Sequence, residues 1–303
     1  MANIPFKKDV TFEYGVVDQI SPMIRRAIAP NPSSFTLHGT GTYIIGQGQV
    51  GVIDPGPDDP VHIQAILDAV KGETVSHIII THTHRDHSPG AAPLKAETDA
   101  EIWGCGPHGH GRIKKADGGG VASDEGADTD YMPDSLANDA DLLDTKHWSL
   151  QAVHTPGHTS NHTCFHLREE NALFTGDHVM GWSTTIVSPP DGDMRQYMQS
   201  LKKLLLRSDD HYWPTHGPRI EQPKAFVTEL IKHREEREEQ IARCLSQQIG
   251  GIPDMVKAMY QDVPEHLHSA AARSVLSHLV HMVATDRAFC DGEPGPDTVY
   301  RAA

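Results

Sequence analysis

Four side chains that can bind metal ions, His82, His84, Asp86 and His87, directly follow the apolar run 77–80. That run is short and rich in isoleucine, so we predict a buried strand that ends where the cluster begins. In an extended segment, residues two apart point to the same side, which places the rings of His82 and His84 together. Neutral imidazole and carboxylate oxygen are ligands of zinc, and iron and manganese accept them as well. The stretch therefore predicts a metal site; a surface turn is the alternative, because the chain has 21 histidines.

Three more candidate ligands follow other apolar runs later in the chain. His158 follows the tight turn Pro156-Gly157, Asp177 ends the run 172–176, and His216 follows a third run. The two oxygens of the Asp177 carboxylate can bridge two ions. Each residue alone is a weak signal, because a lone His or Asp after a strand is more often a cap or a surface residue. Their order after the first cluster is the stronger signal, since open α/β sheets place their sites at the carboxyl ends of strands.

These residues resemble the ligand motif of the metallo-β-lactamase-fold hydrolases, a superfamily that also contains glyoxalase II and metal-dependent nucleases. The resemblance covers about residues 35–220, and none of the seven positions departs from the family pattern. It implies an α/β fold, the αββα sandwich, that holds two zinc ions, with iron or manganese as alternative metals. By family geometry, the first metal is bound by His82, His84 and His158, the second by Asp86, His87 and His216, and Asp177 bridges them.

The resemblance implies a hydrolase in which a hydroxide shared by two metals attacks an ester, thioester or lactam carbonyl of a small molecule. Asp86 would also act as a catalytic residue by accepting a hydrogen bond from this nucleophile. Three other functions stay open on the same fold: an endoribonuclease or phosphodiesterase that acts on RNA, an iron-dependent oxygenase, and a metal-binding protein without catalysis. No Gly-x-Ser-x-Gly motif supports a serine nucleophile instead.

The composition agrees with an enzyme that acts on a small molecule. The chain has 303 residues and a formal net charge of −15, which disfavours broad electrostatic binding of nucleic acid or an anionic membrane. Residues 1–14 lack the apolar stretch of a secretory signal, and no run of about 18 apolar residues predicts a membrane span. Four widely spaced cysteines predict reduced thiols. We therefore expect a cytoplasmic protein that does not bind membranes.

Hairpins and helices must position these ligands. Short β-branched runs separated by turn residues predict two hairpins, over 35–54 and 161–174. Between them, apolar residues at helical spacing predict a helix over 63–70, and the strand 75–80 completes a β–α–β unit that ends in the metal cluster. A second helix, over 194–205, has an apolar stripe that we interpret as core.

The segment Leu37-x-Gly39-Thr40-x-Thr42-Tyr43 resembles the lactamase-beta-2-like branch of the superfamily, whose best-known member is an endoribonuclease. This segment could line the substrate pocket, and a simple hairpin kink is an equally open interpretation. Two other places supply candidates for substrate contact: the His- and Gly-rich turn 107–112 and the polar residues after Asp177. Together the candidates are Gly39, Thr40, Thr42, Tyr43, His110, Ser183 and Thr184.

Residues 104–147 interrupt the pattern of strands and helices. Between Asp117 and Asp144 there are nine acidic residues and no Lys or Arg, together with a run of three glycines. We predict a solvated acidic insertion that serves as a lid or is partly mobile.

Residues 223–303 differ in character from residues 1–222, so we predict two domains that meet there. A long helix over 223–249, two further helical stretches and a short hairpin resemble the winged-helix tail of the same branch. The charged run 234–239 predicts a solvated face of the long helix. Winged helices often bind nucleic acid, but residues 224–303 contain nine Lys or Arg and twelve Asp or Glu, a net charge of −3. We therefore expect this part to serve in packing or in a homodimer.

Overall fold

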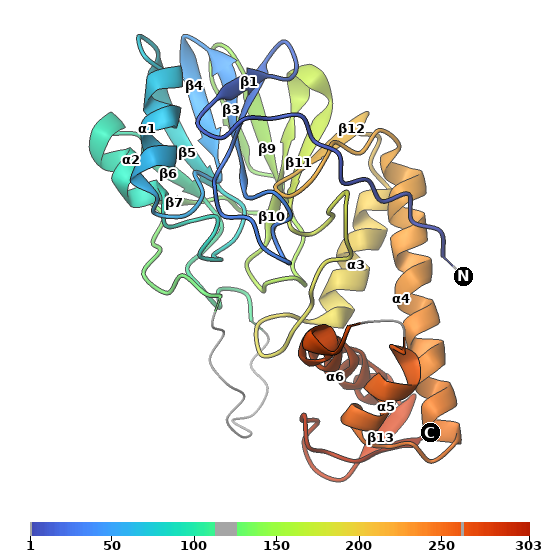
Figure 1. Ribbon diagram of the computed structural model, residues 1–303. Helices are drawn as coiled ribbons and strands as arrows, with labels where there is room; N and C mark the ends of the chain where they lie inside the picture. The colour runs from blue at the N-terminus through green and yellow to red at the C-terminus, as the bar shows by residue number, and fades with distance from the viewer. Residues whose placement is uncertain (1, 113–125, 262–263) are drawn as a thin grey trace.

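The computed structural model describes residues 2–112, 126–261 and 264–303. In this part of the chain, a seven-stranded sheet and a five-stranded sheet pack face to face, with helices on their outer faces. Figure 1 shows α1 and α2 outside the first sheet and α3 outside the second, and the C-terminal helices lie beyond one end of the sandwich. The predicted αββα sandwich is confirmed.

The first sheet changes from antiparallel to parallel at the strand that leads to the metal cluster. Strands β1 to β4 pair antiparallel, whereas β4, β5, β6 and β7 pair parallel. Parallel neighbours need crossover connections, which α1 (Pro60–Ala69) and α2 (Ala91–Thr98) provide. The strands in order are β1 (Val17–Gln19), β2 (Ile24–Ile28), β3 (Gly41–Gln47), β4 (Gln49–Ile53), β5 (Thr74–Ile80), β6 (Glu101–Gly104) and β7 (Ser135–Leu136).

The second sheet is antiparallel except at its last pair, β11 and β12, which α3 (Met194–Leu205) connects. The short 3-10 turn η1 (Arg168–Glu170) joins β10 to β11. The strands are β8 (Leu142–Asp144), β9 (Ser149–His154), β10 (Thr163–Leu167), β11 (Ala172–Gly176) and β12 (His211–Pro214). Large apolar side chains from both sheets fill the space between them and include Tyr43, Trp148, Phe165, Phe174 and Trp213. This core holds the two sheets in register, so that loops from both meet at one edge.

The C-terminal part begins with α4 (Pro223–Ser246), which packs against α3. Next come α5 (Ile252–Met259), the short turn η2 (Glu265–Leu267), α6 (His268–Ala284) and the hairpin of β13 (Ala288–Cys290) and β14 (Tyr300–Ala302). These elements enclose a separate apolar core with the end of α4. The helices and the hairpin agree with the predicted winged-helix part, and the domain boundary at residue 222 stays a prediction.

The first predicted hairpin is shorter than its sequence pattern suggests. Residues 34–38 form turns, and β3 begins only at Gly41. The backbone is left-handed at Leu37, and the amide of Thr40 donates to the side chain of Asn31 at 2.9 Å. Local side-chain hydrogen bonds therefore replace the strand pairing here.

The acidic insertion is more ordered than predicted in the portion that the structure describes. Residues 135–136 and 142–144 form β7 and β8, one at the end of each sheet. Residues 126–128 pair with the metal cluster itself: the Arg85 amide donates to Gly126 and the Asp128 amide donates to Thr83, both at 2.9 Å. The glycine run and the start of the acidic stretch lie outside the described residues.

The prediction of a solvated face for residues 234–239 is wrong at two positions. Arg234 is 3% exposed and Glu238 is 8% exposed. The two residues lie four apart, on the same stripe of α4 as the buried Ile241 and Leu245. Groups on other elements bind both side chains: the Thr185 carbonyl accepts from Arg234, and His281 and Arg287 donate to Glu238.

Candidate metal centre

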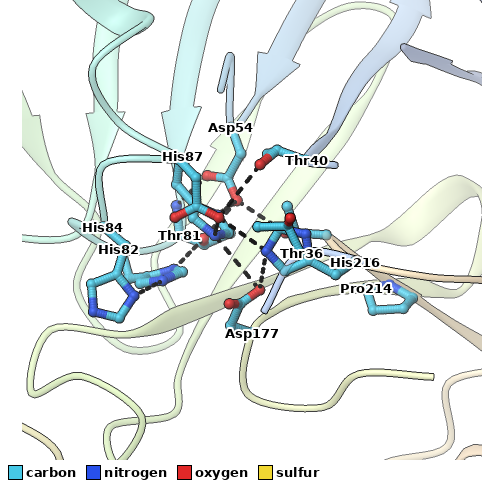
Figure 2. Close-up of polar contacts among 12 residues, drawn as sticks. Thr36, Thr40, Asp54, Thr81, His82, His84, His87, Asp177, Pro214 and His216 are labelled. Carbon is cyan, nitrogen blue, oxygen red and sulfur yellow. Dashed lines mark hydrogen bonds and ion pairs between the residues drawn. The ribbon is translucent and has the colours of Figure 1, made fainter. Parts of the chain in front are cut away.

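The seven predicted ligands meet at one edge of the sandwich. His82, His84, Asp86 and His87 lie in the turn that follows β5, whereas His158 follows β9. Asp177 and His216 follow the parallel strands β11 and β12. Figure 2 shows the rings of His82 and His84 on one side of Asp177 and the ring of His216 on the other. The structure thus brings together residues up to 134 positions apart, from His82 to His216.

Three rings form the first group. The Nδ1 atom of His84 lies 3.0 Å from Nε2 of His82 and 3.1 Å from Nε2 of His158. These three nitrogens face one another closely enough to share one cation. The geometry suits a metal with nitrogen ligands, such as zinc.

The second group combines two rings with a carboxylate. Oδ2 of Asp86 lies 3.1 Å from Nε2 of His216 and 3.4 Å from Nε2 of His87. These ligand atoms also lie close enough to surround one cation. The mixture of nitrogen and oxygen ligands is one that zinc, iron and manganese accept.

Asp177 lies between the two groups. Its Oδ1 atom is 3.4 Å from Nε2 of His216 and 3.6 Å from Nε2 of His87. Its Oδ2 atom faces the first group, 3.8 Å from Nε2 of His158. One carboxylate therefore presents one oxygen to each group, as a bridging ligand would.

The outer nitrogens of the rings are held so that the inner ones can bind a cation. Nδ1 of His158 lies 2.6 Å from the Ile186 carbonyl, and Nδ1 of His216 lies 3.0 Å from the Gly39 carbonyl. A carbonyl oxygen accepts only, so both Nδ1 atoms carry a proton and both Nε2 atoms point inward, where they can bind a metal once they are deprotonated. Within the described residues, Nε2 of His87 and Oδ1 of Asp177 are buried and have no hydrogen-bond partner. Such atoms are costly unless something binds them, and a pair of divalent cations fits this donor set.

Both carboxylates of the centre are ionised at neutral pH. Burial alone would raise the pKa values of Asp86 and Asp177, but His87 and His216 lower both pKa values well below the usual range. Burial also opposes protonation of His216, yet Asp177 and Asp86 raise its pKa to about 10. A metal ion must displace such protons, so its binding releases protons to solvent.

Asp54 is a supporting residue that the sequence analysis did not identify as one. This buried residue accepts hydrogen bonds from the amide of Thr81 at 2.9 Å and from its hydroxyl at 2.7 Å. It also accepts from Nδ1 of His87 at 2.9 Å and from the hydroxyl of Thr215 at 3.2 Å. Asp54 therefore joins the turn after β5 to the end of β12 and orients His87. Its backbone is left-handed, with φ 47°, which no local pattern around a strand end reveals.

His162 is a second supporting residue that the sequence analysis missed. Its ring packs against that of His82, with centroids 5.0 Å apart. Its Nε2 atom lies 3.2 Å from the amide of Asp177, and its Nδ1 atom lies 2.9 Å from the hydroxyl of Thr155. Burial, helped by nearby histidines, lowers the pKa of His162 well below its usual value. The neutral ring accepts from the Asp177 amide and fixes the backbone of that ligand.

Thr42 and Tyr43 lie inside the protein, and their predicted contact with substrate stays a prediction. Both are buried, and their hydroxyls are bonded inside the protein, to the Asp54 carbonyl at 2.7 Å and the Pro214 carbonyl at 2.6 Å. Gly39 supports the centre through its carbonyl, which binds His216. Thr40 is buried as well, but its hydroxyl lies 3.4 Å from Oδ2 of Asp86 and so contacts a predicted ligand.

The other substrate-contact candidates lie on loops near the metal centre and stay predictions. His110 is exposed, on the turn whose neighbouring His108 lies 3.2 Å from the hydroxyl of Thr83. Ser183 and Thr184 are half-buried, in the loop that follows Asp177.

Residues 36–216 match the family model of the metallo-beta-lactamase superfamily. The chain belongs to this superfamily. Residues 252–295 match the beta-lactamase associated winged helix domain, which confirms the predicted C-terminal architecture. Metallo-beta-lactamase superfamily members are generally hydrolases, and the two His–Asp groups are compatible with the divalent metals that the superfamily binds. In the described residues, no helix has the length and apolar character needed to cross a membrane.

Relatives within the superfamily agree with the predicted branch. The beta-lactamase-like protein 2 homolog of Drosophila melanogaster is 32% identical over 274 residues, which cover 87% of this chain and 88% of that protein. The atrochrysone carboxyl ACP thioesterase dmxR1 of a Cryptosporiopsis species is 32% identical over 235 residues, with 76% and 65% covered. A solved beta-lactamase domain protein from Burkholderia ambifaria has the same fold, with a TM-score of 0.81, 19% identity, and 97% and 96% covered.

Proposed function

We propose that this protein is a dinuclear metal-dependent hydrolase whose substrates are small carbonyl compounds, thioesters first among them. The observation that carries the proposal is the position of Asp177, which presents one carboxylate oxygen to each of two ligand groups. A carboxylate in this position can bridge two ions.

In this proposal the seven ligands divide into two sets around the bridging carboxylate. One ion would be held by His82, His84 and His158, and the other by Asp86, His87 and His216. Two bound zinc ions would lower the pKa of a shared water towards about 7 and polarise the carbonyl oxygen of the substrate. Asp54 and the carbonyls of Gly39 and Ile186 hold the rings in the orientation that this chemistry requires.

Asp86 has a second role in the proposal, as a catalytic residue. Its side chain is 26% exposed, more than the 10% of Asp177, so it faces the side from which substrate arrives. The ionised carboxylate can accept a hydrogen bond from the attacking water and orient it. The hydroxyl of Thr40 lies near its Oδ2 atom and helps to fix that carboxylate.

Two observations support thioesters over esters and amides. One relative is named an ACP thioesterase, at 32% identity. In addition, the low pKa values of Asp86 and Asp177 leave neither carboxyl able to donate a proton to a leaving group. A thiol with a pKa of about 8.5 leaves readily as the thiolate, whereas an alkoxide or amine needs a proton.

A phosphodiesterase that acts on RNA is the second candidate function, because residues 252–295 match a winged-helix domain. The charge of this chain opposes it. Phosphate binding needs contacts from Lys and Arg, and in this chain acidic residues outnumber them, which gives a net charge of −15.

One panel tests these functions against each other. The purified protein is assayed on p-nitrophenyl esters, acyl thioesters, bis-p-nitrophenyl phosphate and single-stranded RNA, with elemental analysis of the same preparation. We expect close to two zinc equivalents per chain and the highest kcat/KM on a thioester. One iron per chain, with oxygen uptake on a thiol substrate, would assign the protein to the oxygenases; two metals with no turnover on any substrate would reject the hydrolase.

A further inference from the structure

A buried arginine on the helix that leads to the winged-helix part reaches into the catalytic part. Arg234 of α4 is 3% exposed, and its guanidinium lies over the ring of Tyr197 in α3, 5.2 Å from the ring centroid. Its Nη2 atom donates a hydrogen bond to the carbonyl of Thr185. Among the described residues, Arg234 forms no ion pair, so a carbonyl and an aromatic face are the contacts that hold this buried cation.

The Thr185 carbonyl belongs to the loop that carries one predicted metal ligand and orients another. The Thr185 hydroxyl donates to the carbonyl of Asp177 at 2.6 Å. The next carbonyl along the chain, that of Ile186, accepts from Nδ1 of His158 at 2.6 Å. Arg234 therefore holds the peptide that stands between Asp177 and the hydrogen-bond acceptor of His158.

Helix α6 of the winged-helix part packs against both α3 and α4, the helices that carry Tyr197 and Arg234. Burial lowers the pKa of His278 in α6 to about 4, and the nearby positive charge of Arg234 contributes to this shift. On the side of the metal centre, the ring of His178, the residue after Asp177, packs against the ring of Tyr197, with centroids 4.7 Å apart. Tyr197 therefore connects the guanidinium of Arg234 to the loop that follows Asp177.

One helical turn further along α4, Glu238 fixes the C-terminal part in place. Its carboxylate accepts from Nδ1 of His281 at 2.7 Å and from Nη1 of Arg287 at 2.5 Å, and Nδ1 of His278 lies 3.3 Å away. These contacts attach α6 and the residue before β13 to α4. The same helix therefore binds the winged-helix part through Glu238 and the metal-centre loop through Arg234.

We infer that Arg234 is a positioning residue for the metal centre: it holds the Thr185–Ile186 peptide so that the Ile186 carbonyl orients His158. The inference rests on the proposed dinuclear site, but not on the identity of the substrate. A partner in the outer coordination shell of a metal typically contributes about 10- to 100-fold to metal affinity. Since His158 belongs to the first ligand group, the effect should fall on that site more than on the site of Asp86, His87 and His216.

The matched pair for a test lies on one helix. Arg234→Met removes the hydrogen bond to Thr185 and keeps much of the side-chain length, whereas Arg237→Met is the control. Arg237 lies three residues on, over the ring of Tyr260 at 4.5 Å and bonded to Gln240, away from the metal-centre loop. Zinc is titrated into each full-length apoprotein in competition with a chromogenic chelator, which gives two dissociation constants per variant. We expect Arg234→Met to weaken one of them about 10- to 100-fold and Arg237→Met to leave both within about threefold of wild type.

The conservative variant separates positioning from folding. Arg234→Lys keeps the charge and can still donate one hydrogen bond. The zinc affinity of its weakened site should therefore lie between the affinities of that site in wild type and in Arg234→Met. If Arg234→Met does not fold by circular dichroism, Arg234→Lys decides, with a selective weakening of one zinc site as the supporting result. Wild-type affinity at both sites in a folded variant, or equal weakening of both sites, overturns the inference. If wild type binds two zinc ions but hydrolyses no thioester, the proposed substrate class fails while the zinc titration still judges Arg234; a wild type that binds no zinc overturns both.

Discussion

Two clusters in this molecule use the same residue types and differ in what they leave unpaired. At Glu238, a single carboxylate accepts from the side chains of His281 and Arg287 and lies close to His278, so donors surround one acceptor. At the metal centre, ring nitrogens that carry lone pairs face each other and the oxygens of two carboxylates. In the first cluster, the charge of Arg287 balances that of Glu238, whereas the second combines two carboxylates with five imidazole rings.

The comparison shows why a count of histidines and acids does not identify a metal site. The outer nitrogens of His158 and His216 are bonded to carbonyls, which turns their lone pairs inward. The ring nitrogens of His278 and His281 that face Glu238 serve as donors instead. The hydrogen-bond partner on the far side of each ring therefore decides whether a cluster can take a cation.

The largest expected effect is the loss of the bridging carboxylate. Asp177→Ala removes ligand atoms from both groups, so we expect zinc affinity to fall more than about 100-fold and turnover to disappear. Asp209→Ala is the matched control, because Asp209 is a buried carboxylate paired with Arg207 and precedes β12, whereas His216 follows the other end of that strand. Elemental analysis after gel filtration measures the outcome. Equal zinc content in the two variants would contradict the assignment of Asp177.

Removal of metal should act on the metal centre and leave the Glu238 cluster intact. A ligand at about 1,000 times its Kd stabilises the folded state by about 4 kcal/mol, so chelation should lower the free energy of unfolding by a similar amount at such zinc levels. Urea unfolding with and without a chelator measures the change, and added zinc should restore it. A stability that does not respond to chelator would mean that the centre binds no metal tightly.

Acid should act on the Glu238 cluster. Burial alone would raise the pKa of Glu238, but hydrogen bonds from His278, His281 and Arg287 lower it well below its usual range. The ionised carboxylate therefore stabilises the fold above its unfolded pKa of about 4.3, and this stabilisation is lost as pH falls towards the lower folded pKa. The pKa of His278 is lowered to about 4, so the unfolded chain takes up that proton first, below about pH 6.5, and stability falls in the same direction.

The variant Glu238→Gln sharpens this prediction, with chelator present throughout to remove the metal contribution. At pH 7.5 we expect its free energy of unfolding to be about 3 kcal/mol lower than that of wild type, because the charged Arg287 loses its carboxylate partner. Below about pH 4 the difference should shrink, since the Glu238 carboxyl of the unfolded wild-type chain takes up a proton while the folded one stays ionised. A difference that stays constant from pH 7.5 to 3.5 would show that the charge of Glu238 does not matter.

The smallest expected effect concerns RNA. Residues 224–303 carry a net charge of −3, so we expect single-stranded RNA to bind weakly and with little dependence on salt. Fluorescence anisotropy at 50 and 200 mM salt measures this. Tight binding that weakens steeply between these concentrations would favour the ribonuclease over the thioesterase.

The meeting of the seven candidate ligands was predictable because they follow apolar runs, and the carboxyl ends of strands collect at one edge of an α/β sheet. The supporting residues were not, because their partners are far away in sequence. Asp54 looks like the end of a hairpin, and nothing near it indicates that it will bind Thr81, His87 and Thr215.

The charged stretch of α4 was misinterpreted for a related reason. Arg and Glu at helical spacing are typical of a solvated face, and local sequence carries no sign of the opposite. The partners that bury Glu238, such as His278 and Arg287, lie 40 or more residues later. Burial of a charge depends on such distant compensation, so it is the feature that sequence patterns predict least well.

The left-handed backbone at Asp54 sets a limit for attempts to make this protein more heat-stable. A glycine there would relieve a conformation that costs other residues about 1 kcal/mol or more, and a search for stabilising substitutions would select it. The same glycine would remove the carboxylate that orients His87 and ties two strands together. Asparagine tolerates the backbone equally well, but its amide has one acceptor oxygen where four donor contacts converge. A choice that considers the backbone alone is therefore wrong at position 54, because the loss of these hydrogen bonds destabilises the fold by more than the relieved strain stabilises it.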